Sequence, residues 1–207
     1  MPAAQPIPIT LSTVTGDALL RWLPAVARLR IAVFREWPYV YDGDEAYERK
    51  YLARYAGKPG AAVVLALDGE ECVGASTCLP LSQEGPNVRA PFEAAGWPVA
   101  RVCYFGESVL LPTYRGQGIG VKFFTAREAH AASLGLDICV FCAVVRPGEH
   151  PLKPAGYVPL DEFWRHRGYQ RRPDLVCTMR WQDLGETAET AKQLVFWAKS
   201  LSAASLP

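Results

Sequence analysis

The chain has 207 residues, of which 50% are hydrophobic, and a formal net charge of +1. A chain of this length predicts a single domain over residues 1–207 that buries a core without disulfides or a metal. Its basic residues are spread along the sequence and no apolar run reaches the roughly 18 residues of a membrane span, so neither nucleic acid nor a membrane is an expected partner. We therefore expect a cytoplasmic protein, and the sequence leaves open whether it forms a homodimer.

Hydrophobic periodicity, glycines and prolines divide the chain into alternating strands and helices. In chain order we expect a strand over 7–14, helices over 17–35 and 45–55, strands over 61–67 and 71–79, a loop with one helical turn at most over 83–98, a strand over 102–111, a helix over 118–134, a strand over 136–145, a loop over 146–159, a short helix over 160–166, and strands over 175–181 and 194–199. The predicted order is β-α-α-β-β-β-α-β-α-β-β.

A glycine-rich turn follows the strand expected over 102–111. It reads YRGQGIGVK over residues 114–122 and leads into the next predicted helix. Such a turn leaves backbone N–H groups unpaired beside the positive end of a helix, which is a binding site for phosphate. The spacing fits neither the dinucleotide pattern G-x-G-x-x-G nor a Walker loop, because Val121 precedes Lys122. The pattern that remains is R-x-x-G-x-G.

This pattern resembles the coenzyme A pyrophosphate loop of the GCN5-related N-acetyltransferase (GNAT) superfamily, Q/R-x-x-G-x-G/A. The segment FWRHRGY over 163–169 is similar to that family's F-Y-x-x-x-G-F, and the order of elements is also the family's. The resemblance implies an α/β (α+β) fold with a mixed, mostly antiparallel central sheet of about seven strands and about four helices. It also implies acetyl-CoA (coenzyme A) as the cofactor and a small-molecule or peptide amine as the acceptor.

The loop supplies the expected ligands of the pyrophosphate. They are the N–H groups of Gly116, Gln117, Gly118, Ile119 and Gly120, with Arg115 beside them. By the resemblance, the preceding strand bulges and hydrogen-bonds the pantetheine arm at Leu110 and Leu111. The alternative is an ordinary strand-to-helix turn, although a glycine within a helical turn costs about 1 kcal/mol relative to alanine.

The candidate general base is Glu107, a carboxylate inside the apolar run YFGESVL over 104–110. Burial there would raise its pKa toward a useful value. Many family members have a glutamate at this place, five residues before Pro112, which deprotonates the amine. The alternative is a glutamate at a strand end that faces solvent or pairs with an arginine.

The general acid is not defined by the sequence. The family often uses the tyrosine of F-Y-x-x-x-G-F, and Trp164 stands at that place. Tyr157 and His150 in the long loop are substitutes, and solvent is the third alternative, because a thiol with a pKa near 8.5 is readily protonated. We predict that Trp164 has a structural role and that Tyr169 belongs to the core.

The connection between the first two helices lines the acceptor side in the family. Here it carries Trp37, Tyr39, Tyr41 and Asp42, and aromatic rings with carboxylates suit a cationic amine. The alternative is a hydrophobic staple with helix caps.

The favoured function is an N-acetyltransferase that moves an acetyl group from acetyl-CoA to a primary amine. A non-catalytic acyl-CoA sensor of the same fold is one rival. A serine hydrolase is a weaker one, because Gly106-Glu107-Ser108 only begins a nucleophile elbow and lies within a strand. No metal is expected: Cys139 and Cys142 form a C-x-x-C, but on a strand they face opposite ways.

Overall fold

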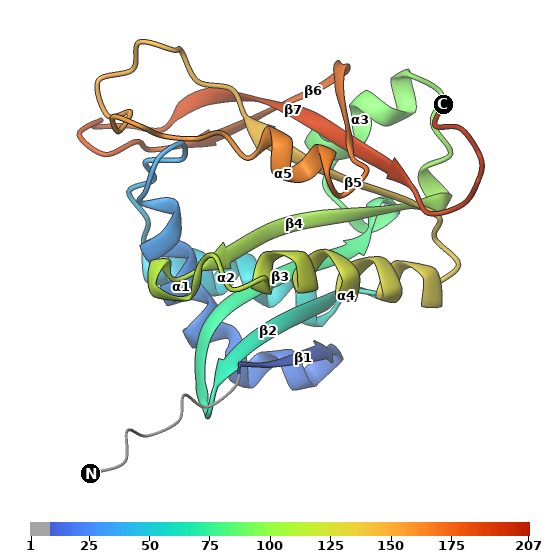
Figure 1. Cartoon of the computed structure of the whole chain (residues 1–207), viewed down its shortest axis with the longest axis horizontal. Coiled ribbons are helices and arrows are strands. Elements are labelled where there is room, and N and C mark those ends of the chain that lie inside the picture. Colours follow the sequence, from blue (N-terminus) through green and yellow to red (C-terminus); the bar gives the residue numbers. More distant parts are fainter. Residues whose placement is uncertain (1–8) are drawn as a thin grey trace.

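The structure is a computed structural model that describes residues 9–207 (Figure 1). Its strands and α-helices are β1 (Thr10–Thr15), α1 (Leu23–Phe34), α2 (Glu45–Ala56), β2 (Ala62–Asp68), β3 (Glu71–Pro80), α3 (Pro86–Ala94), β4 (Val102–Leu110), α4 (Ile119–Ser133), β5 (Ile138–Val144), α5 (Asp161–Arg165), β6 (Gln170–Trp181) and β7 (Thr190–Ser200). They form a seven-stranded sheet in the order β1-β2-β3-β4-β5-β7-β6. Only the β4–β5 pair is parallel, so the mixed, mostly antiparallel sheet is confirmed.

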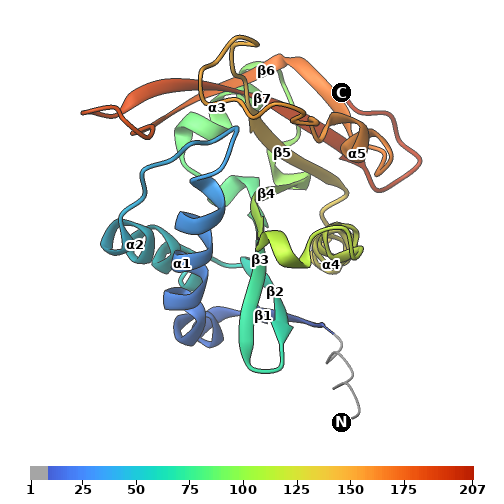
Figure 2. The ribbon, with the colours of Figure 1, turned by 60° about the vertical axis from the view of Figure 1, so that its left-hand side comes forward.

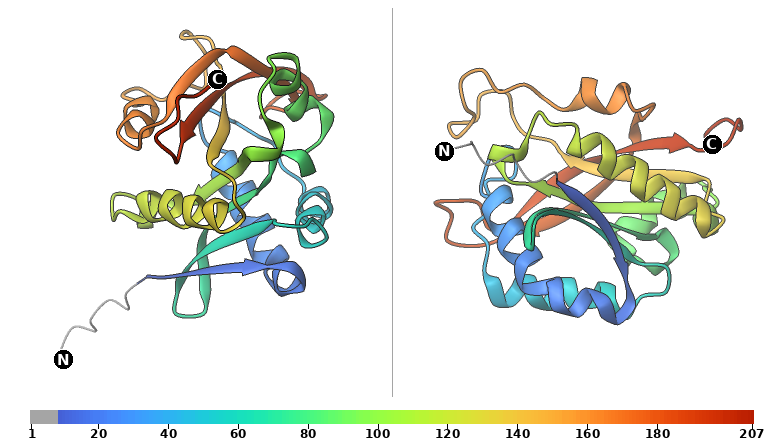
Figure 3. Two further views of the ribbon diagram at one scale, coloured as in Figure 1. Left: turned by 90° about the vertical axis from the view of Figure 1, so that its right-hand side faces the viewer. Right: turned by 60° about the horizontal axis from the view of Figure 1, so that its bottom comes forward.

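Helices cover both faces of the sheet. Figures 2 and 3 show α1, α2 and α3 on one face and α4 and α5 on the other. The main hydrophobic core lies under α1–α3 and includes Leu52, Phe92 and Phe196. A second core, under α4 and α5, includes Phe105 and Trp197. Both cores are built from the period-two alternation of the central strands.

Strands β4 and β5 separate partway along their length. They pair from Val102 opposite Ile138 to Tyr104 opposite Val140, after which only the β3 edge of β4 stays paired. The β3–β4 register also shifts between Ser76 and Cys78, as it does at a β-bulge. The family's splayed and bulged strand is therefore present in this chain.

The predicted elements differ from the structure at three places. Residues 83–98 hold the helix α3, not one turn of helix, because proline needs no N–H in the first turn and Val88 and Phe92 are buried on one side. The last two strands begin earlier than predicted, at Gln170 and Thr190. The first strand begins at Thr10, and residues 7 and 8 of its predicted range lie outside the described residues. The described helices include none that is long and apolar enough to span a membrane.

The six cysteines are free thiols. As predicted, Cys139 and Cys142 point to opposite faces: Cys139 lies in the core under α4, and Cys142 packs against the core under α1–α3. Within residues 9–207, no group of three or more His, Cys, Asp or Glu side chains could hold a metal ion.

Trp164 should matter for stability. Its ring lies 5.1 Å from the rings of Phe141 and Trp197, in edge-on packing that joins α5 to the sheet. We expect Trp164→Ala to lower the free energy of unfolding by about 3 kcal/mol, and Trp164→Phe by less than about 1.5 kcal/mol. Urea denaturation measures both. His166→Ala, at an exposed position near the same helix end, is the control; an equal loss there would contradict the structural role.

Candidate active site

A cleft of about 870 Å³ opens on the α1–α2 face beside the region where β4 and β5 separate. It is lined by α1, α2, the segment between them, β4 and the residues that join β6 to β7. Glu107 and Gly106 reach it from β4, and Cys142 reaches it from β5. The sequence therefore folds so that residues from both halves of the chain surround one cavity.

The β-bulge turns Glu107 toward this cleft. A Cβ on Gly106 would collide with the Tyr55 hydroxyl and lie 2.7 Å from Thr77 Oγ1, so only glycine allows the strand to approach α2 this closely. The Glu107 N–H donates to Thr77 Oγ1 at 3.2 Å, in place of a partner on the β3 backbone. The bulge thus holds the carboxylate on the same face as Gly106.

Glu107 is buried and paired with Arg30. Its side chain is only 2% exposed, and Oε2 lies 2.9 Å from Arg30 Nη1. Burial raises the pKa of the Glu107 carboxyl, while the Arg30 charge opposes that rise. The interpretation of Glu107 as a solvent-facing residue is therefore wrong, and the alternative pairing with an arginine is present.

Two residues of this cluster were not predicted from the sequence. Arg30 of α1 also pairs, through Nε, with Glu48 of α2, and the Glu48 side chain is fully buried. A signal for Glu48 existed, because it shares the buried side of α2 with Leu52 and Tyr55 at helical spacing. No local pattern indicated that two separate helices would bring these charges to Glu107.

The glycine-rich loop forms the start of α4 on the other side of β4. Gly116 and Gly118 have φ values of 76° and 78°, a conformation that favours glycine, and no side chain caps the helix at Gly118. The first N–H groups of the helix, including those of Ile119 and Gly120, have no acceptor within the helix. The turn thus presents open N–H groups at a helix start, and its binding of a phosphate stays a prediction.

Arg115 lies in this loop but is engaged by the protein. Its guanidinium forms two hydrogen bonds with the Glu36 carboxylate, at 2.7 and 3.1 Å, and a third with the Leu110 carbonyl at 3.1 Å. The Leu111 N–H donates to the Val73 carbonyl at 3.0 Å. One backbone group of each expected pantetheine-binding residue is thus already bonded within the protein.

The segment that follows α1 contributes three of its four predicted residues to the cleft. Tyr39, Tyr41 and Asp42 line it. Trp37 does not belong to this lining; its ring packs against His150 at 4.9 Å and Tyr157 at 6.1 Å, which joins the segment to the long loop.

A buried arginine, Arg146, fixes this segment against the hairpin formed by β6 and β7. Arg146 donates to the carbonyls of Pro38 and Tyr39 at 2.8 and 2.7 Å, and to both carboxylate oxygens of Asp183. Val40, a β-branched residue at φ 46°, is held by hydrogen bonds on both sides, from its N–H to Glu36 and from Leu184 to its carbonyl. These hydrogen bonds hold the segment after α1, which carries Tyr39, Tyr41 and Asp42, against the residues that follow β6.

The residues considered for the general acid lie in different places. Trp164 packs in the core, as predicted, and Tyr169 is buried with its hydroxyl donating to Glu128 at 3.0 Å. His150 and Tyr157 contact Trp37 outside the residues that line the cleft. Tyr104 of β4 also lines the cleft, with its hydroxyl 3.3 Å from Cys142 Sγ, and it was not predicted from the sequence.

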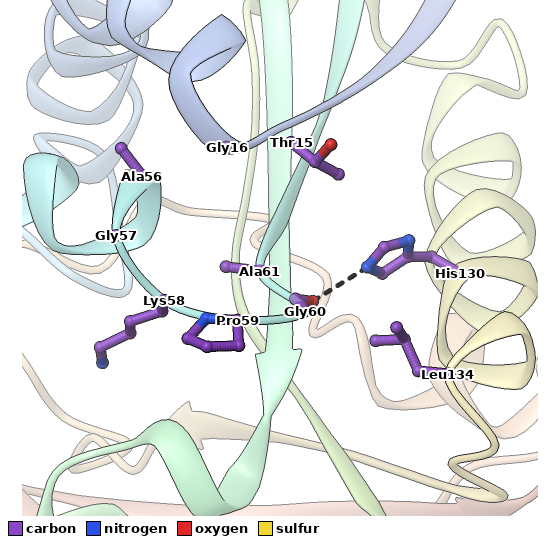
Figure 4. A pocket seen from close by; sticks show the side chains of 10 residues that line it. All are labelled: Thr15, Gly16, Ala56, Gly57, Lys58, Pro59, Gly60, Ala61, His130 and Leu134. Carbon is purple, nitrogen blue, oxygen red and sulfur yellow. Dashed lines mark hydrogen bonds between the residues drawn. The ribbon is translucent and has the colours of Figure 1, made fainter.

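A second hollow, of about 480 Å³, lies away from this cleft, between the end of β1, the α2–β2 loop and the end of α4 (Figure 4). Its one histidine, His130, uses Nε2 to donate to the Gly60 carbonyl at 2.9 Å. This hydrogen bond joins α4 to the α2–β2 loop, which is a structural role for the histidine.

Comparisons with known proteins agree with this geometry. A model of the acetyltransferase (GNAT) family matches residues 26–155, which is more than half of the chain. The fold is similar to the ribosomal-protein-alanine N-acetyltransferase of Brucella melitensis, at 16% identity and a TM-score of 0.61, over 93% of this chain and 99% of that one.

Two similar structures contain the cofactor or its product. One is yncA of Salmonella typhimurium with its cofactor acetyl-CoA, at 12% identity and a TM-score of 0.60, over 95% of this chain and 97% of that one. The other is an aminoglycoside 6'-N-acetyltransferase complexed with coenzyme A, at 16% identity and a TM-score of 0.57, over 95% and 99% of the two chains. Among curated proteins, no sequence matches.

Removing Arg30, the cation that Glu107 and Glu48 share, should destabilise the folded protein. We expect Arg30→Leu to lower the free energy of unfolding by about 3–5 kcal/mol near pH 7.5, because Glu107 and Glu48 would remain buried without a counter-charge. The loss should shrink toward pH 5.5. Burial already raises the pKa of Glu107 in the folded protein, so the folded variant binds a proton more readily than the unfolded chain as the pH falls.

Chemical denaturation at the two pH values measures this effect. Arg35→Leu is the control, because Arg35 lies just after the same helix and its pair with Asp42 is exposed; it should cost less than about 1 kcal/mol. A loss at Arg30 that does not depend on pH would mean that lost packing, not unpaired charge, causes it.

Proposed function

This chain belongs to the acetyltransferase (GNAT) family, and we propose that it transfers an acetyl group from acetyl-CoA to a primary amine by direct attack. The observation that carries the proposal is the pair of features on β4 and the turn that follows it. A buried carboxylate at the bulge faces the cleft, and an anion cradle opens the helix that covers the other face.

The cradle residues fit coenzyme A. The loop 116–120 offers N–H groups and a helix N-terminus to a pyrophosphate, and the separated β4 and β5 leave an unpaired strand edge for a chain of amides such as pantetheine. When bound, the cofactor supplies an acyl group activated as a thioester. Arg115 adds positive charge at the loop, and in this structure it forms an ion pair with Glu36.

Glu107 is the proposed general base. The acceptor amine is an ammonium ion at neutral pH and must lose a proton before its nitrogen can attack the thioester carbonyl. A carboxylate whose pKa is raised by burial can take that proton, directly or through one water. As the new C–N bond formed and the C–S bond broke, the nitrogen would lose a second proton and the released thiolate would gain one, so that a proton passed between them through solvent or a group near the cleft would balance the step.

The acceptor would enter from the α1–α2 side. Tyr39, Tyr41 and Asp42 line that side, and aromatic rings beside carboxylates bind cationic amines well. Release of coenzyme A thiol from acetyl-CoA with a panel of amines (amino acids, polyamines, aminoglycosides and peptides) tests the proposal. A protein that binds coenzyme A but turns over no amine in the panel would instead be the acyl-CoA sensor.

A side chain at Gly118 should block the cofactor. We expect Gly118→Asn to weaken coenzyme A binding by about 10- to 100-fold, the worth of a lost charge-assisted hydrogen bond or two. The variant should fold, because asparagine tolerates positive φ and a Cβ there meets nothing within 4 Å.

Calorimetry with coenzyme A measures the affinity. Gly135→Asn is a matched control, because Gly135 follows the other end of α4 with φ 73° and equally open surroundings. Unchanged affinity in the Gly118 variant would remove the cofactor from this loop.

Neutralising Glu107 should slow the chemical step. We expect Glu107→Gln to lower kcat by roughly 10²- to 10⁴-fold at neutral pH, the usual worth of a general base, with coenzyme A affinity retained. Ser108→Ala is the control: Ser108 is the next residue of β4 and is exposed, so its loss should leave kcat unchanged. Inactivation by Ser108→Ala would instead support the alternative function of a serine hydrolase.

A further inference from the structure

The floor of the cleft holds one buried cation between two buried carboxylates. Arg30 contacts Glu107 through Nη1 at 2.9 Å and Glu48 through Nε. The side chains of the three residues are 11%, 2% and 0% exposed, in the order Arg30, Glu107, Glu48. The guanidinium also lies over the Tyr51 ring, 4.5 Å from its centroid, so its position is fixed by packing as well as by charge.

The charges in this cluster do not balance. With both carboxylates ionised, the cluster carries one net negative charge, and its side chains are almost entirely buried at the floor of the cleft. Glu48 and Glu107 each keep one oxygen, Oε1, that is buried and has no hydrogen-bond partner among the described residues. Adding a proton to one of the two carboxylates stabilises such a cluster, because protonation removes the buried excess negative charge.

We propose that Glu48 is a positioning residue for Glu107: it holds the Arg30 guanidinium from α2, so that this arginine does not neutralise Glu107 alone. The inference rests on the proposed role of Glu107 as the base. A carboxylate held alone by a buried arginine is a poor proton acceptor, because taking the proton would leave the arginine unpaired. With Glu48 in place, Arg30 keeps a partner in both protonation states of Glu107.

Other titratable groups near Glu107 act differently. On α2, burial raises the pKa values of Tyr51 and Tyr55, and on β4 it raises that of Tyr104, so these hydroxyls stay neutral in an assay range of pH 5–9. Tyr39, in the segment after α1, is likewise buried and its pKa raised. Tyr41, in the same segment, also has its pKa raised by burial and by Glu48, so it too stays neutral.

Two further ionisable groups are Glu84 and Cys142. Glu84, after β3, also raises the pKa of Glu107, but it has partners of its own, the Gly85 N–H at 2.8 Å and Lys58 at 3.9 Å. Cys142 of β5 contacts the Tyr104 hydroxyl. Of the carboxylates, Glu48 is the one that shares the Arg30 guanidinium with Glu107.

The test is the pH dependence of kcat/KM between pH 5 and 9, with acetyl-CoA and an amine that the wild type accepts. In Glu48→Gln, Arg30 pairs with Glu107 alone, so the acidic limb should move down by about one pH unit and the plateau should fall, because the base is weaker. Glu48→Asp keeps the negative charge, so its acidic limb should lie close to that of the wild type. Glu45→Gln, an exposed carboxylate of the same helix, should change nothing.

In the double variant Arg30→Gln with Glu48→Gln, the acidic limb of the kcat/KM–pH profile should shift in the opposite direction. Glu107 would then be buried without a cation, so the acidic limb should move above that of the wild type. This variant also decides the matter if Glu48→Gln alone does not fold. A ¹³C NMR titration of the Glu107 carboxyl follows the same shifts without relying on turnover.

The outcomes separate this inference from the proposed function. An acidic limb that stays in place in Glu48→Gln, while thermal stability falls, would make Glu48 purely structural and overturn the inference, with the base role of Glu107 intact. A wild-type limb and rate in Glu107→Gln would overturn the base role, and the inference with it.

Discussion

Strand β4 pairs with β3 from Cys103 to Leu110, apart from the bulge at Gly106 and Glu107, but it pairs with β5 only from Val102 to Tyr104. A sheet that stayed closed between β4 and β5 would leave no space for the cleft and no free strand edge beside it. Because the strands separate, the residues of β4 beyond Tyr104 lie beside the cleft under α1 and α2, and their edge toward β5 is unpaired. Both halves of the proposed chemistry depend on this separation.

The bulge at Gly106 and Glu107 adds the second constraint. In a regular strand these neighbours would point to opposite faces, and the carboxylate could not lie in the cleft with Gly106 beneath α2. The shifted register with β3 places both on one side, and the Thr77 hydroxyl accepts the N–H that the bulge leaves unpaired. On the other face, Arg127 of α4 donates to the Glu107 carbonyl at 3.4 Å, so the helix that begins with the cradle also supports the bulge.

The sequence predicted the parts of the site that are encoded locally. The glycine spacing located the open helix start, and a lone carboxylate in an apolar run indicated the buried Glu107, while the roles proposed for both stay predictions. Arg30 and Glu48 are far from it in the sequence, and nothing near them shows which strand they meet. The polar start of β6, with Pro173 and Asp174, resembled a loop, since an edge strand tolerates proline and charge that a central strand would not.

The proposed acceptor side, formed by the segment after α1, is held in place mainly by long-range contacts and not by its local sequence. Tyr41 bridges to Asp183, the Asp42 N–H donates to the Gln182 carbonyl at 2.9 Å, and Trp181 donates through Nε1 to the Tyr39 carbonyl at 3.1 Å. These bonds join the segment after α1 to the end of β6, at opposite ends of the chain. The aromatic side of the cleft is therefore held in place by contacts with the hairpin of β6 and β7. The Arg115–Glu36 pair joins the same segment to the cradle, so the acceptor wall contacts the cofactor loop at one end and the hairpin at the other. Glu36 is thus the residue through which the segment after α1 contacts Arg115 of the glycine-rich loop.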